Sequence, residues 1–331
     1  MSRNNSGKVI HGGTVRWHQR HSTEKILDFS ANLNPFPPNV PLECDAGAIG
    51  AYPDDRYETL KEAISSVFRR DPEEIAVGNG SVEVIRAYCA STLGAGDRAA
   101  IFEPTFGEYG MAVRLCGGEV TSDPSGAAVR FLCNPNNPDG ALTPRTTVLA
   151  ILDELKPDRR LFVDEAFIEL SDPAASVSDI GDPALFVSRS ITKSFAVPGL
   201  RFGFGFGDPD LVADMETRRL PWTVNACAES FTIAALEHYH DLEESRRLIR
   251  AERAWLEDAF KRIGLSPLPS SANYLFVPLP CEASAVCASL SDRRILVRDC
   301  TSFGLPKAIR VAVRTREENR ILMEALPACL P

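Results

Sequence analysis

The sequence predicts an α/β protein in which a large domain with a mostly parallel sheet precedes a small α+β C-terminal domain. Short apolar runs alternate with helical patterns over the first two thirds of the chain, which favours a parallel sheet covered by helices on both faces. A long, charged, helix-favouring segment follows at residues 226–262. Three further strand-like runs come after it, separated by helical stretches, which indicates a second and smaller domain.

Changes in composition and in expected secondary structure along the chain set the expected domain boundaries. Residues 1–40 are expected to form an N-terminal arm that joins the small domain, because the stretch 30–55 is rich in Pro, Asn and Gly and such stretches favour extended chain. Residues 41–225 would then form the large domain. Residues 226–262 would form a linking helix, and residues 263–331 the small domain.

Each expected strand is a short apolar run bounded by polar or turn-forming residues. In the large domain these runs span residues 74–79, 98–103, 129–134, 160–165, 185–190 and 201–207. In the small domain they span residues 272–279, 294–299 and 308–314. A helix is expected at 81–92, because Val82, Ile85 and Cys89 fall on one helical face.

Composition excludes several classes of function. The 331 residues carry a formal net charge of −9 at pH 7, so nothing favours nucleic-acid binding, which usually shows a basic patch. No run approaches the roughly 20 apolar residues of a membrane span, and the N-terminus has no apolar core of a secretory signal. The nine cysteines include no CxxC pair, which predicts a reduced, cytoplasmic protein. The sequence has no HExxH motif, and its N-terminal histidines have no nearby cysteine or clustered acidic residues, so no metal site is expected.

Unusual polar residues follow the expected strands at their carboxyl ends, where ligands of open α/β sheets bind. The stretch GNGS (78–81) is either an anion site at a helix N-terminus or a simple turn capped by Ser81. The stretch NPNNPDG (134–140) is either a stiff loop that aims an amide side chain or an ordinary turn. Asp164 ends a third strand, where a carboxylate needs a cationic partner. The alternative role for Asp164 is a structural salt bridge with an arginine.

Lys193 is one of only seven lysines, and it stands in the stretch SRSITKSFAVPGLRFG (188–203). Ser190 and Thr192 precede it, and Arg201 follows eight residues later. One amine, two hydroxyls and one guanidinium would suit an aldehyde that carries a phosphate. The alternative is a buried helix start whose lysine extends to solvent. The overlapping GFGFG run is not a GxGxxG dinucleotide motif, and we interpret it as a strand with close backbone contacts.

Together these residues supply the parts that a pyridoxal-phosphate site needs. A lysine can condense with the cofactor aldehyde, and a carboxylate can keep the pyridine nitrogen protonated. An amide can bind the phenolic oxygen, while hydroxyls, a helix end and an arginine can bind the phosphate. Each signal is weak or moderate by itself, but the combination is specific.

The ordered motifs GNGS, PTFGEY, NPNNPDG, VDEAF, S-x-T-K and GLRFG resemble the fold-type-I aminotransferase superfamily over nearly the whole chain. The resemblance implies that Lys193 bonds the cofactor and that Asp164 partners its pyridine nitrogen. It implies that Asn137 binds the phenolic oxygen. It also implies that the cofactor phosphate is held by Gly80, Ser81, Ser190, Thr192 and Arg201.

The same resemblance implies cofactor contacts for two aromatic residues and a missing contact at a third. Phe106 would stack on the cofactor ring. Tyr52, in the AYPDD segment, would reach the phosphate of the partner subunit's cofactor, which implies a homodimer with the site at its interface. Many relatives have a tyrosine where this chain has Phe167, so a hydroxyl that bonds the phenolic oxygen is missing here.

Within the superfamily two reactions compete. The blocks HGG (11–13), LDFSANLNP (27–35) and LVRDCTSFGLPKAIRVAVRTREEN (296–319) are similar to threonine-phosphate decarboxylases of the cobalamin pathway. They favour decarboxylation of L-threonine O-3-phosphate to (R)-1-aminopropan-2-yl phosphate. The alternative is a histidinol-phosphate aminotransferase. A binding or regulatory protein without catalysis is a third possibility. The joint presence of Lys193, Asp164, Asn137 and Arg201 argues against it.

Four residues are candidates to bind a small phosphorylated amino-acid substrate. Arg298 and Arg310 would clamp its anionic groups, helped by His11 and Asn32 from the N-terminal arm. A guanidinium pairs in bidentate fashion with either carboxylate or phosphate, so the arginines do not separate the two reactions. The alternatives are a salt bridge for Arg298 and simple exposure for His11.

Overall fold

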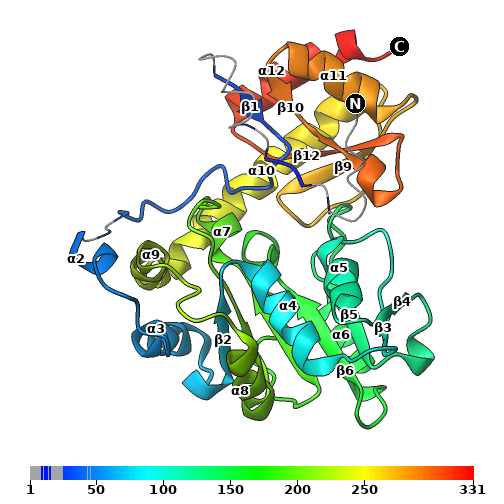
Figure 1. Cartoon of the computed structure of the whole chain (residues 1–331). Helices are drawn as coiled ribbons and strands as arrows, with labels where there is room; N and C mark the ends of the chain where they lie inside the picture. Colours follow the sequence, from blue (N-terminus) through cyan, green and yellow to red (C-terminus); the bar gives the residue numbers. More distant parts are fainter. Residues whose placement is uncertain (1–8, 10, 14, 16–24, 43, 45) are drawn as a thin grey trace, which may run out of the picture.

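The computed structural model describes residues 9, 11–13, 15, 25–42, 44 and 46–331 (Figure 1). A seven-stranded sheet organises the lower half of the molecule in this view, and a three-stranded sheet organises the upper half. The strands of the large sheet are β2 (Ile75–Gly78), β3 (Arg98–Ala100), β4 (Glu119–Thr121), β5 (Val129–Cys133), β6 (Arg160–Asp164), β7 (Leu185–Arg189) and β8 (Gly203–Phe206).

The large sheet has the order β2-β8-β7-β6-β5-β3-β4. β8 is antiparallel to both of its neighbours, and the remaining pairs are parallel. The mostly parallel sheet predicted from the alternation of strands and helices is therefore confirmed. Each of the six strands expected in the large domain is present within the predicted range.

Helices cover both faces of this sheet because the strand residues point alternately to either side. In β6, Phe162 packs with one cluster, while Leu161 and Val163 pack with another. One face carries α4 (Ser81–Thr92), α5 (Glu108–Leu115) and α8 (Pro209–Arg218). The other face carries α3 (Glu58–Phe68), α6 (Arg145–Asp153) and α9 (Ala226–Glu237).

The upper half contains the antiparallel sheet β11-β12-β9, in which β12 (Ala308–Ala312) lies between β11 (Arg298–Asp299) and β9 (Tyr274–Pro278). A short parallel pair joins β1 (Leu27–Asp28) to β10 (Ile295–Leu296), which places the N-terminal segment beside the C-terminal elements. The helices of this half are α11 (Ala283–Asp292) and α12 (Arg316–Ala325).

The segment that we expected as one linking helix, residues 226–262, is broken. α9 ends at Glu237, a 3-10 turn spans Tyr239–Asp241, and α10 covers Leu242–Arg262. Leu236 and Leu242 both pack into the same buried cluster. Residues six apart on a straight helix point about 120° apart, so the turn is what allows both to face that core.

One pair of cysteines corrects the expectation of a fully reduced protein. Cys44 and Cys227 form a disulfide across 183 residues. The bond ties the segment before α2 (Ala46–Ile49) to the start of α9. The other seven cysteines are free. Sequence spacing could not show this pair, because only the fold brings the two residues together.

Crossing a lipid bilayer requires a helix that is both long and apolar, and no helix in the described part of the chain meets that requirement.

Candidate active site

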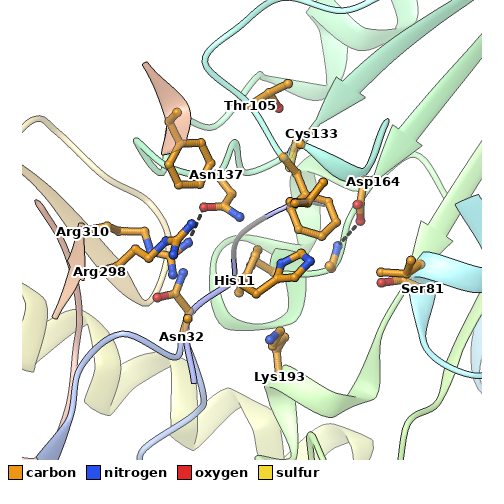
Figure 2. Close-up of a pocket in the computed structure, with 18 of the residues that line it drawn as sticks. His11, Asn32, Ser81, Thr105, Cys133, Asn137, Asp164, Lys193, Arg298 and Arg310 are labelled. Carbon is orange, nitrogen blue, oxygen red and sulfur yellow. Dashed lines mark hydrogen bonds between the residues drawn. The ribbon is translucent and has the colours of Figure 1, made fainter. Parts of the chain in front are cut away.

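The predicted polar residues converge at the carboxyl ends of β5, β6 and β7, where they line a cavity of about 480 Å³ (Figure 2). Its walls come from the large sheet, the C-terminal sheet and the N-terminal segment. Twelve of the fourteen site residues predicted from sequence line it: His11, Asn32, Ser81, Phe106, Asn137, Asp164, Ser190, Thr192, Lys193, Arg201, Arg298 and Arg310.

Lys193 lies in the short helix α7 (Ile191–Ser194), directly after β7. Its Nζ atom has no hydrogen-bond or ion-pair partner within the described chain. Burial, reinforced by the nearby charges of Arg310 and Arg201, lowers the pKa of Lys193 to about 8. Near that pH the amine is half neutral, which is the form that attacks an aldehyde. The alternative for Lys193 was a side chain that extends to solvent. The structure does not show this, because the side chain faces the cavity.

Asp164 ends β6 and is 3% exposed. Its Oδ2 accepts a hydrogen bond of 2.7 Å from the hydroxyl of Tyr109, and its Oδ1 accepts one of 3.0 Å from the backbone N–H of Ala166. Burial raises the pKa of Asp164, and both hydrogen bonds counteract that rise. No arginine or lysine of the described chain forms a salt bridge with it, which leaves this buried acid in need of a cationic ligand.

Tyr109 is a site residue that the sequence did not identify. It stands in the PTFGEY motif, one helical turn after Phe106, and is fully buried. The turn spacing places both residues on the same side of α5's start, where the rings meet edge to face at 5.5 Å. A tyrosine three residues after the predicted stacking aromatic is a signal that could have suggested this position.

A space bordered by the backbone of Gly80, Ser81 and Gly203 lies at the N-terminus of α4, and we call it the cradle. Gly80 caps this helix with φ +81, and a Cβ there would lie 2.2 Å from Nη2 of Arg201. A Cβ on Gly203 would lie 2.2 Å from the backbone nitrogen of Ser81. α4 begins at Ser81 with Gly80 as its N-cap, so the alternative in which Ser81 caps the helix is wrong. Backbone N–H groups at such a helix start attract anions.

Two hydroxyls complete this cradle from the other side. Oγ of Ser190 and Oγ1 of Thr192 are 2.8 Å apart, and both residues line the cavity. They follow β7 on the same turn that carries Lys193. The hydroxyls, the helix N-terminus and the guanidinium of Arg201 together make a set of donors suited to one phosphate group.

A second cationic wall is formed by Arg298 and Arg310, which are directly opposite each other in the β11–β12 register. Arg310 donates to Oδ1 of Asn137 and to the carbonyl of Ser30, and Figure 2 marks its bond with Asn137. Arg298 donates to Oγ of Ser302 at 2.6 Å. Burial lowers the pKa of Arg310 to about 10, and the charge of Arg298 adds to this effect.

The bond from Arg310 fixes the orientation of Asn137. Because Oδ1 accepts from the guanidinium, the Nδ2 group faces away from that bond and has no partner among the residues described. An amide nitrogen can donate to a phenolic oxygen, as predicted for this position. Near Arg310, Asn32 has both side-chain polar atoms buried without a hydrogen-bond partner. Such orphaned groups indicate a polar ligand at this wall.

The remaining aromatic residues are divided between the cavity and the surface. Phe106 and Phe167 line the cavity. Because Phe167 has no hydroxyl, none is supplied from this position, and its ring packs edge-on against Tyr274 at 5.1 Å. Tyr52 is 79% exposed, stacks on Trp222 at 4.4 Å and does not line the cavity of its own subunit.

Comparisons with known proteins agree with this geometry. A model of the aminotransferase class I and II family matches residues 24–125 and 121–326. The histidinol-phosphate aminotransferase of Symbiobacterium thermophilum is 33% identical, over 92% of this chain and 91% of that protein.

Two solved structures extend the comparison to the fold. The L-threonine-O-3-phosphate decarboxylase of Porphyromonas gingivalis superposes with a TM-score of 0.83 at 25% identity, over 92% of this chain and 99% of that chain. The histidinol-phosphate aminotransferase of Sinorhizobium meliloti, solved in complex with pyridoxal-5′-phosphate, superposes with a TM-score of 0.87 at 24% identity, over 99% and 98% of the two chains.

Proposed function

Because this chain belongs to the aminotransferase class I and II family, we propose that it is an enzyme acting on the primary amine of a small phosphorylated substrate. Family membership confirms the cofactor predicted from the sequence, pyridoxal 5′-phosphate. The observation that carries the proposal is the meeting of an unpartnered Lys193, a buried Asp164 and the pair Arg298 and Arg310 in one cavity.

The residues present fit this cofactor. The glycine-lined cradle at α4 leaves room for its phosphate, where added Cβ atoms would collide. Asp164 would hold the proton of its ring nitrogen, and Asn137 would donate from Nδ2 to its phenolic oxygen. When bound, the cofactor supplies an electron-poor ring that stabilises negative charge at the substrate carbon bearing the amine.

Lys193 then serves as the proton carrier at that substrate carbon. A pKa near 8 lets its Nζ atom exist as amine and as ammonium in comparable amounts near pH 8, which is the condition for efficient proton transfer in either direction. Transamination requires this atom to remove the proton from the substrate carbon. Decarboxylation requires it to deliver a proton after carbon dioxide has left.

Two reactions remain candidates. The name of the 33% identical relative supports transamination of histidinol phosphate better than it supports decarboxylation. Decarboxylation of L-threonine O-3-phosphate, which we expected from the N-terminal and C-terminal sequence blocks, is the second candidate. Those blocks and the decarboxylase of Porphyromonas gingivalis support it. Arg298 and Arg310 fit both, because each substrate set presents carboxylate or phosphate groups.

A paired assay separates the two reactions. The enzyme loaded with cofactor is incubated with histidinol phosphate and 2-oxoglutarate while glutamate is followed, and with L-threonine O-3-phosphate while carbon dioxide is followed. Glutamate without carbon dioxide establishes transamination, and the converse establishes decarboxylation. Activity in neither arm contradicts the proposal of a phosphorylated amine substrate.

The active form is proposed to be a homodimer. Five large apolar side chains are strongly exposed in the segment 42–52 and the loop 220–222: Leu42, Ile49, Tyr52, Leu220 and Trp222. We refer to them as the apolar patch. Tyr52 and Trp222 of this patch stack on each other. Large apolar side chains exposed side by side mark protein interfaces, and a second copy of the chain packed there would bring Tyr52 toward the partner's cavity, as the family resemblance implies.

A further inference from the structure

The N-terminal strap, which we define as Val9 and His11–Gly13, is fastened against the mouth of the cavity. The backbone N–H of Gly13 donates to Oγ of Ser30 at 3.0 Å. A Cβ on Gly12 would lie 2.5 Å from the carbonyl oxygen of Ser30, so no larger residue fits there. The side chain of Val9 borders Gly107, just before α5. These contacts fix the position of the His11 imidazole.

That imidazole is held by a buried carboxylate. Nε2 of His11 lies 2.8 Å from Oε1 of Glu108. Glu108 opens α5 and is 5% exposed, although its side chain is ionisable. Its second oxygen is 3.4 Å from a guanidinium nitrogen of Arg86 on α4. An ionised carboxylate can only accept hydrogen bonds, so Nε2 carries the hydrogen and donates it.

The other ring nitrogen of His11 faces a different environment. Nδ1 has no hydrogen-bond partner in the described part of the chain. His11 lines the cavity, and Figure 2 shows its ring between Asn32 and Arg298 on one side and Ser81 and Asp164 on the other. The cradle at Ser81 accounts for the cofactor phosphate, so the opposite side is open to a second anion.

We propose that Glu108 is a positioning residue that holds His11 so that Nδ1, together with Arg298, binds the phosphate group of the substrate. This inference rests on the proposed function, because it requires a substrate that carries a phosphate. Glu108 acts through His11 and does not contact the anion. With Glu108 at Nε2 and phosphate at Nδ1, each ring nitrogen of His11 would face an oxygen that can accept its hydrogen.

The physical reason for a buried glutamate here is the separation of like charges. A carboxylate facing the phosphate directly would repel it. In this proposal the imidazole of His11 lies between the carboxylate of Glu108 and the phosphate. The carboxylate then orients the imidazole and does not face the phosphate. The simpler explanation is that Glu108 stabilises the N-terminus of α5 as an acidic first-turn residue. That explanation predicts an effect on stability and none on phosphate selectivity.

The experiment uses the full chain loaded with cofactor and five variants: Glu108→Gln, Glu108→Ala, His11→Ala, the double variant Glu108→Ala/His11→Ala, and Glu317→Gln. Gln keeps the shape of Glu108, which guards against loss of folding. Glu317 is also an acidic first-turn residue, at the start of α12. Its variant is the control for loss of a helix-terminal charge.

Two measurements are made. Binding of inorganic phosphate to each loaded variant is measured by calorimetry. KM and kcat are measured for whichever phosphorylated amine the wild type uses, and for the same amine without its phosphate. We expect His11→Ala and Glu108→Ala to weaken phosphate binding and raise KM about 10- to 100-fold, as for loss of a hydrogen bond to a charged group, with kcat nearly unchanged. Glu108→Gln should show a smaller loss.

The double variant and the unphosphorylated amine give the sharpest distinctions. Because Glu108 acts through His11, the double variant should be no worse than His11→Ala. KM for the unphosphorylated amine should not change. Any of three results would overturn the proposal. The losses of phosphate affinity in the two single variants could multiply in the double variant, KM could rise equally for both amines, or the loaded wild type could bind no phosphate. If neither candidate substrate reacts, the proposed function fails, while the calorimetric comparison of the variants still tests this inference.

Discussion

At the scale of single residues, the site contains several polar groups whose burial is only partly compensated within the chain. Arg310 is 6% exposed and no carboxylate of the described chain pairs with it. Asn32 has no hydrogen-bond partner, and the amine of Lys193 has none either. Leaving such groups buried costs free energy of folding. A bound ligand that contacts these groups would offset this cost.

Replacing Lys193 with Met tests this cost. The folded pKa of Lys193 is about 8, below its ordinary value of 10.5. Below pH 8 the lysine is protonated in both the folded and the unfolded chain, and the folded chain carries the full penalty. Without cofactor, the Met variant should therefore be more stable at pH 7, by about 1–3 kcal/mol, in denaturant titrations.

The sign of the pH dependence makes this prediction sharper. Between pH 8 and 10.5 the folded chain has released the proton while the unfolded chain retains it, so the stability of the wild type rises with pH. The advantage of Lys193→Met should thus shrink across this window. A Met variant that is less stable than the wild type at pH 7, or a constant gap, would contradict the argument. The variant should also lack turnover.

Tyr109→Phe tests the hydrogen bond to Asp164. Loss of the 2.7 Å bond leaves Oδ2 of Asp164 buried with one donor fewer, so its charged form becomes less favourable and its hold on the cofactor nitrogen weakens. We expect cofactor affinity to fall about tenfold, as for a charge-assisted hydrogen bond. Titration of the stripped enzyme with cofactor measures this affinity.

The matched control for this change is Tyr88→Phe. Tyr88 is also fully buried, packs in the same cluster as Tyr109, and its hydroxyl has no hydrogen-bond partner. Removing that hydroxyl should leave cofactor affinity unchanged and should not reduce stability. Equal effects of the two substitutions would show that Tyr109 acts by packing and not through Asp164.

At the scale of elements, the sequence predicted those strands whose burial creates an apolar run. β6 and β7 are examples, because nearly all their residues are buried. β4 was missed, since its three residues are largely exposed at the edge of the sheet and form no apolar pattern. The break at Tyr239–Asp241 was missed as well, because it depends on where the core lies and not on a Gly or Pro.

Gly80→Ala tests the cradle at the start of α4. The added methyl group would collide with the guanidinium of Arg201, since the Cβ position lies 2.2 Å from Nη2. It would also strain a backbone with φ +81. We expect cofactor affinity to fall at least tenfold, together with about 1–2 kcal/mol of stability. Cofactor titration and denaturant titration measure the two effects.

Gly96→Ala separates strain from collision. Gly96 has a similar φ of +85, but a Cβ there meets nothing within 4 Å. It should therefore lose comparable stability and keep its affinity for cofactor. If both variants lose affinity to the same extent, backbone strain spreading to the site would be responsible, and the steric account of the cradle would fail.

At the scale of the whole molecule, the site joins segments that are far apart in the sequence. Arg310 and Asn137 are separated by 173 residues, His11 and Glu108 by 97, and Tyr109 and Asp164 by 55. Motifs identified the residues one by one, because each motif is local. The bonds between motifs could not be predicted, since they depend on how segments far apart in the sequence pack together.

Leu220→Asp tests whether the apolar patch is a subunit interface. Leu220 is 69% exposed in one subunit, so a charge there should cost little in a monomer, but burying it in a dimer would be costly. Sedimentation should show the wild type as a dimer and this variant as a monomer. Leu115→Asp is the control, because Leu115 is 64% exposed on α5, outside the patch. A monomeric wild type would contradict the prediction.

Mixing two impaired subunits tests whether the site is shared. If Tyr52 serves the partner's cofactor, a Tyr52→Ala subunit still contributes Lys193 to its own site, and a Lys193→Ala subunit still contributes Tyr52 to that same site. Half of the randomly exchanged dimers are mixed, and one of the two sites in each is intact. Activity should therefore recover to about a quarter of the wild-type value, as two-fold symmetry requires. Tyr52 stacks on Trp222 at the surface of its own subunit, so a role within that subunit would give no recovery beyond the sum of the separate variants.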